Sequence, residues 1–171
     1  MKDTTQNIKD LLTMFHDFEI VDIEKENDVL ILKTIIPWGE LWDIENYKLT
    51  FKFNGCEFFK CVYHKRTSNE LVRTENAAYY PTVQKTTEDF EEIKRLELNV
   101  QRHSFAPPNI YTLYCNGFGD GVEFGTLEFT ADSFQIFDNE DKVFSLDKMK
   151  SLATEWWTSI EKMWKNKKKT E

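Results

Sequence analysis

Short runs in which apolar and polar residues alternate occupy most of the chain between residues 18 and 137. The segment "YKLTFKF", residues 47–53, is the clearest, because Leu49, Phe51 and Phe53 would face one side and the residues between them the other. A period of two residues is typical of strands with one buried face. Asn54-Gly55 follows directly and favours a type I′ turn, which predicts a hairpin between this strand and "CEFFKCVYH".

Patterns with a helical period lie near the two ends of the chain. Ile8, Leu12 and Phe15 predict a short N-terminal helix. After Ser145, a favourable N-cap, the apolar residues from 146 to 164 project onto an arc of about 140° on a helical wheel. This pattern predicts a long C-terminal helix whose tryptophans, Trp156 among them, are integral to the core.

Further alternating runs predict an antiparallel meander in the second half of the chain, and residues 18–23 and 29–36 predict a hairpin around "EKEND". Residues 65–87 are polar and weakly patterned, which predicts a long excursion with little regular structure. We therefore expect a single α+β domain over residues 1–171, with a basic tail at 165–171. Its sheet is expected to be mostly antiparallel, with about seven or eight strands, a short N-terminal helix and a long C-terminal helix.

The charge balance restricts the partners. The net charge is −8, and five lysines fall within residues 162–169, so the rest of the chain is more acidic still. An acidic surface repels phosphate backbones and anionic lipids, which argues against nucleic acid and membrane and favours a basic protein partner or simple solubility. The N-terminus has no apolar run long enough for a signal peptide, and the three cysteines show no disulfide pattern, so we expect a cytoplasmic protein.

Two residue groups could carry chemistry. His16-Asp17 could begin a metal or proton-transfer site, but both residues also suit the bend between a helix and a strand. Cys56, Cys61 and His64 resemble metal ligands, but the spacing of the cysteines would place them on opposite faces of a strand, and a second ligand pair is missing. We therefore expect no catalytic residues, no metal ligands and no cofactor.

The segment "IIPWGELWDIENY" is the strongest candidate for recognition. It places Trp38 and Trp42 in a short connection between two strand signals, beside Glu40, Asp43 and Glu45. The two indoles could cap the core beneath the loop. Alternatively, large rigid side chains among acids could anchor a basic partner, and we take these five residues as the candidate binding site.

The stretch "FHDFEIVDIEKENDVLILKT" resembles the opening of a group of small bacterial immunity-type proteins of polymorphic toxin systems. The resemblance rests on Phe15, His16, Asp17, Ile20 and Ile23, within a stretch of 20 of the chain's 171 residues. It implies a protein that binds and blocks a cognate toxin.

Together these observations favour a non-catalytic cytoplasmic protein-binding domain, immunity-like in function. Two alternatives stay open: a small-ligand-binding or hydrolytic domain with a cavity lined by Phe and Tyr, and a structural subunit of a homo-oligomer.

Overall fold

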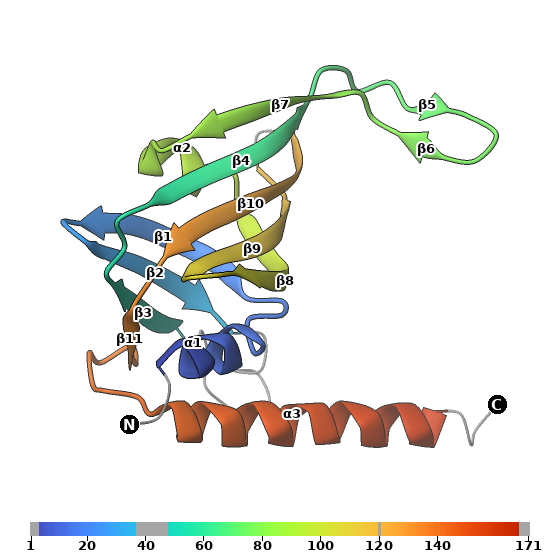
Figure 1. The fold of residues 1–171 in the computed structure, drawn as a ribbon. Helices are drawn as coiled ribbons and strands as arrows, with labels where there is room; N and C mark the ends of the chain where they lie inside the picture. The colour runs from blue at the N-terminus through green and yellow to red at the C-terminus, as the bar shows by residue number, and fades with distance from the viewer. Residues whose placement is uncertain (1–3, 37–47, 120, 168–171) are drawn as a thin grey trace.

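The structure, a computed structural model, describes residues 4–36, 48–119 and 121–167. These residues form a nine-stranded antiparallel sheet, a separate two-stranded hairpin and three helices (Figure 1). The helices are α1 (Thr4–Leu12), α2 (Phe90–Lys94) and α3 (Leu146–Lys167). The strands are β1 (Glu19–Glu26), β2 (Val29–Ile35), β3 (Lys48–Asn54), β4 (Phe59–Arg66), β5 (Val72–Arg73), β6 (Ala78–Tyr79), β7 (Thr82–Thr87), β8 (Leu98–Ala106), β9 (Ile110–Gly117), β10 (Val122–Thr130) and β11 (Ser133–Phe137).

The α+β class, the antiparallel sheet and the long C-terminal helix are as the sequence predicts, but the expected count of seven or eight strands is wrong. The extra strands come from residues 65–87, where the sequence predicts little regular structure. This stretch completes β4, forms the β5–β6 hairpin and supplies β7, which pairs with β4. β7 lies at the edge of the sheet with nearly all its side chains exposed, so no buried face marked it as a strand.

The hairpin expected around Asn54-Gly55 does not form. β3 pairs with β2 and β11, whereas β4 pairs with β10 and β7. Gly55 does have a positive φ of 74°, but Cys56 N donates to Asp28 O, and the chain crosses to the other half of the sheet. The Asn-Gly pair sets the local dihedral angles, while the partner of each strand is decided by which apolar faces can be buried together.

The sheet consists of two halves that meet at one point. The strand order is β11-β3-β2-β1-β8-β9-β10-β4-β7, and β1 pairs with β8 only through Glu19 and Asn99. The sheet bends so that the halves face each other across one core, because the rings of Phe53 on β3 and Phe129 on β10 lie 5.0 Å apart although their strands are not neighbours.

The N-terminal helix and the first part of α3 close this core on one side (Figure 1). α1 buries Ile8, Leu11 and Leu12. Ser145 caps α3 as predicted, since its Oγ accepts a hydrogen bond from Lys148 N at 3.1 Å. The expected burial of the whole apolar arc of α3 is met only in its first half. Met149 and Ala153 are buried and Trp156 is partly buried against the core, but the later turns leave large apolar side chains exposed.

Candidate protein-binding site

The candidate binding residues predicted from the sequence lie outside the described residues. Trp38, Glu40, Trp42, Asp43 and Glu45 all fall within residues 37–47. The segment is bordered by Ile36 and by Lys48, the first residue of β3. The described strands on either side of this segment, β2 and β3, carry polar side chains on the outer face of the sheet.

A β-bulge places two consecutive residues of β1 on the outer face of the sheet. Ile20 and Ile23 are buried on the core side, and the register with β2 shifts between Ile20 and Asp22, so Val21 and Asp22 both face outward. Lys33 of β2 lies directly opposite Asp22. Its Nζ is 2.8 Å from Asp22 Oδ2 and 3.3 Å from Glu24 Oε1.

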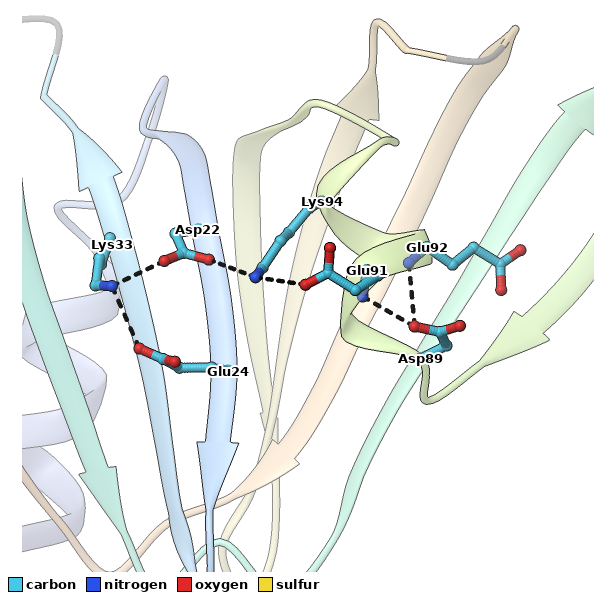
Figure 2. A network of polar contacts seen from close by, with 7 residues as sticks. All are labelled: Asp22, Glu24, Lys33, Asp89, Glu91, Glu92 and Lys94. Carbon is cyan, nitrogen blue, oxygen red and sulfur yellow. Dashed lines mark hydrogen bonds and ion pairs between the residues drawn. The ribbon is translucent and has the colours of Figure 1, made fainter.

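The short helix α2 extends this ion pair into a chain of alternating charges (Figure 2). Lys94 Nζ lies 3.0 Å from Asp22 Oδ1 and 2.8 Å from Glu91 Oε1, so Asp22 stands between two ammonium groups. Asp89 begins the helix by accepting hydrogen bonds from the backbone N–H groups of Glu91 and Glu92. Glu92 points the other way and accepts a hydrogen bond from the Tyr63 hydroxyl of β4 at 2.5 Å.

The pKa shifts of Asp22, Lys33 and Lys94 each move the pKa further from 7. The hydrogen bond from Lys33 lowers the pKa of Asp22, and the hydrogen bond to Asp22 raises the pKa of Lys33. The pKa of Lys94 is raised by its hydrogen bond to Glu91 and then by that to Asp22. A general acid or base works best with a pKa near the operating pH. Asp22, Lys33 and Lys94 therefore act as fixed charges at neutral pH.

A cleft of about 480 Å³ adjoins this network on the outer face of β1, β2 and β3. Asp22, Lys33 and Lys48 line it from the strands, and Asp138 and Asp141 line it from the loop after β11. Backbone N–H groups of Lys142 and Glu140 donate to Asp138 Oδ1 and lower the pKa of this carboxyl. The cleft therefore presents fixed charges of both signs, and Lys48 follows the undescribed segment directly in the chain.

His16-Asp17 forms the bend between α1 and β1. Asp17 has a φ of 67°, its backbone N–H donates to Val100 O at 2.7 Å, and its carbonyl accepts from Asn99 Nδ2 at 3.1 Å. His16 Nδ1 lies 2.8 Å from Asp17 Oδ2, with both side chains well exposed. His16 follows the last residue of α1, Leu12, by four positions, and its ring lies 6.2 Å from that of Trp157 on α3. The pair lies at the junction of the two half-sheets.

The cysteines do not gather around His64. Cys56 lies before β4 rather than on it, which corrects the expected strand placement, while Cys61 faces the core. His64 is half-buried and stacks on the ring of Phe124 at 4.2 Å. Burial raises the pKa of the Cys56 thiol and raises that of Cys61 to about 12, which disfavours the nucleophilic thiolate. Within the described ranges, no group of three or more His, Cys, Asp or Glu side chains converges as metal ligands do.

The aromatic residues of the core are packed on one another. The ring of Phe15 lies 4.8 Å from that of Phe18 and 4.7 Å from that of Phe51. A cleft of about 200 Å³ beside Phe58, Phe59 and Phe90 is smaller than the roughly 300–1,000 Å³ that ligand pockets usually occupy. A ligand site lined by Phe and Tyr stays a prediction.

Sequence reasoning missed the charge network. The first hairpin turns at the two residues Asn27-Asp28, not over the five residues of the predicted loop. Counting residues outward from a two-residue turn along both strands places Lys33 opposite Asp22, so a prediction with this shorter turn would have found the pair. The contribution of Lys94 could not be found in this way, because α2 reaches β1 only through the tertiary fold.

Comparisons with protein-family models, with curated proteins and with solved structures gave no match. No helix in the described part of the chain is long and apolar enough to cross a membrane.

Proposed function

We propose that this chain is a non-catalytic cytoplasmic domain that binds the basic surface of a partner protein, as an immunity protein binds a toxin. The observation that carries the proposal is the fixed-charge cleft on the outer face of β1–β3. Asp22, Asp138 and Asp141 line it together with Lys33 and Lys48, and the pKa values of Asp22 and Asp138 are lowered. Charges that persist at neutral pH serve steering and register in a protein interface better than they serve proton transfer.

The net charge of −8 favours a partner whose binding surface is positively charged. Acidic surfaces accelerate association with basic proteins, and the acceleration decreases as salt screens the charges. Trp38 and Trp42, with Glu40, Asp43 and Glu45, supply the anchor in this proposal, because tryptophan is enriched among the residues that dominate binding energy. Their segment ends directly before Lys48, which lines the cleft.

The test uses the full chain as bait in a lysate of the source cells, followed by binding measurements with the purified captured protein. We expect Trp42→Ala to weaken binding by about 2 kcal/mol or more, which is about 30-fold, while the urea unfolding midpoint stays nearly unchanged. A large loss of stability without a specific loss of binding would instead assign Trp42 to the core.

A matched pair of charge variants tests the cleft. Asp141→Asn removes a cleft charge and keeps a residue that tolerates the positive φ of 58° at this position. Glu75→Gln removes the same charge from the β5–β6 hairpin, which projects from the far end of the molecule in Figure 1. We expect only Asp141→Asn to slow association at low salt. Equal association rates for the two variants would contradict the cleft as the binding surface.

A further inference from the structure

The second half of α3 carries a stripe of large apolar side chains that the described residues leave largely exposed, although the ring of Trp157 lies 6.2 Å from that of His16. The stripe begins as the core-facing side of the helix, where Met149 is fully buried and Ala153 is 6% exposed. It continues along the same helix through Trp157, Met163 and Trp164, whose exposed fractions are 47%, 53% and 69%. Large apolar side chains exposed on successive turns form a patch of the kind that marks an interaction surface.

A groove of about 550 Å³ lies beside the start of this patch, between α1 and α3. Met14, Ala153 and Trp157 form its apolar wall, and Asp10 and Glu161 lie at its polar rim. Lys150 of α3 pairs with Asp10 of α1 at 2.6 Å and ties the two helices together there. Figure 1 shows that α3 continues well beyond α1. The α3 helix therefore lines a groove near its middle and carries exposed apolar side chains, Met163 and Trp164, closer to its C-terminal end.

These two features are complementary when two copies of α3 lie antiparallel. Trp157 and Trp164 are equidistant from a point between residues 160 and 161. A two-fold axis at that point would set Trp164 of each copy against Trp157 and the groove of the other. Every contact would then be made twice, as in the isologous interfaces of symmetric dimers.

The charges on α3 favour the same orientation. The lysines of its last turns, Lys162 and Lys165, follow the acidic residues Glu155 and Glu161 in the chain. Antiparallel pairing brings the basic end of each helix alongside the acidic middle of the other. Parallel pairing would place Lys162 and Lys165 beside their own copies, and like charges held in contact oppose association.

We propose that this chain forms an antiparallel two-fold dimer through the second half of α3, with Trp164 of each copy seated against Trp157 and the α1–α3 groove of the other. The exposed side chains and groove walls of two copies offer on the order of 1,000 Å² of surface, which suits a dimer of moderate affinity. The cleft on β1–β3 lies on other elements and is not used by this contact.

Sedimentation equilibrium of the full chain, from about 1 to 100 µM, tests the proposal. We expect the wild-type mass to rise from monomer to dimer and the Trp164→Glu variant to stay monomeric with unchanged helix content. Phe118→Glu is the matched control, because Phe118 is 70% exposed, against 69% for Trp164, and lies off the helix. It should dimerise like the wild type. A monomeric wild-type protein over the whole range, or equal behaviour of the two variants, would overturn the proposal and leave the patch to a different partner.

Cross-linking tests the orientation. Cys56, Cys61 and Cys115 are buried, so an engineered cysteine is the accessible thiol of the folded chain. With a short bismaleimide, Glu161→Cys next to the two-fold axis should cross-link to its own copy. Lys165→Cys should not, because the two copies of that position would be displaced by about 13 Å along the helix axis. The reverse pattern would overturn the antiparallel arrangement.

Discussion

At the residue scale, Asp17 shows why the His-Asp pair stands where the chain passes from helix to sheet. Its positive φ lets the chain turn out of α1, and its backbone groups bond to β8 as β1 begins. Aspartate is one of the few residues other than glycine that tolerate this left-handed conformation. Both the helix and the start of β1 therefore depend on this single backbone conformation.

Substitution at Asp17 should separate backbone from side-chain effects. Asp17→Val should destabilise the fold by about 2 kcal/mol, because a β-branched residue strains the left-handed region. Asp17→Gly should cost less than about 0.5 kcal/mol despite losing the carboxylate, since glycine adopts this φ freely. Urea unfolding of the two variants measures the difference. Equal losses would mean that the carboxylate, and not the backbone, is what the site requires.

His16 is expected to be structural. Its contact with Asp17 is between two well exposed side chains, so His16→Gln should cost about 1 kcal/mol or less and keep partner binding. The stability comes from chemical denaturation and the binding from the captured partner. A variant that folds normally but loses all binding would make His16 a functional residue.

The Asp22 network should give a measurable pH dependence. The pKa of Asp22 is lower in the folded chain than its usual value of about 3.9, so its carboxylate stabilises the fold above that pH. This contribution is lost as the pH falls through the folded-state pKa. We expect Asp22→Asn to be less stable than the wild type by about 1 kcal/mol at pH 7, and the difference to shrink between about pH 5 and pH 2. A constant difference over this range would contradict the linkage.

At the element scale, α3 should show a gradient of stability effects along its length. Met149→Ala should cost about 3 kcal/mol because Met149 is fully buried. Trp156→Ala should destabilise the fold by about 2 kcal/mol, because Trp156 is only partly buried. A fully buried tryptophan would be expected to cost more. Trp164→Ala should change the stability of the monomer by less than about 0.5 kcal/mol. Urea melts at low protein concentration test this order, and a large loss for Trp164→Ala would mean that the end of the helix is held by the body.

The residue range of a helix or strand was easier to predict from the sequence than the elements that lie beside it in the fold. The apolar spacing of α3 and its Ser145 cap predict the helix, but the point where the helix leaves the body depends on the size of the sheet. In the same way "YKLTFKF" predicts β3, yet its outer neighbour is β11, about 80 residues later. Alternating apolar and polar residues indicate that a strand has one buried face, but they do not indicate which strand pairs with it.

At the scale of the whole molecule, the candidate site was the least predictable part. The fixed charges around Asp22 come from two adjacent strands and from a helix that is distant in sequence. The individual residues look like ordinary surface charges in a chain with thirty acidic residues. The predicted recognition segment at 37–47 remains a prediction, because it lies outside the described residues.

The three thiols should report on opening of the shared core. Cys56, Cys61 and Cys115 are buried, and burial raises the pKa of Cys61 to about 12, so the native chain should resist thiol reagents at pH 8. Leu113→Ala removes a fully buried side chain, and a cost of about 3 kcal/mol should speed labelling about 100-fold. Mass spectrometry of the labelled chain measures each cysteine separately. Earlier labelling of Cys56 alone would show that the half-sheets separate before the core unfolds.

The crossing of the chain between the half-sheets has a consequence for biosynthesis. β3 is complete at Asn54, but β11, which covers its outer edge, ends only at Phe137. β4 likewise waits for β10, which ends at Thr130. Neither half can therefore close until about three quarters of the chain has left the ribosome. Until then, the nascent polypeptide carries unpaired, phenylalanine-rich strand edges, which are the segments that chaperones shield during translation.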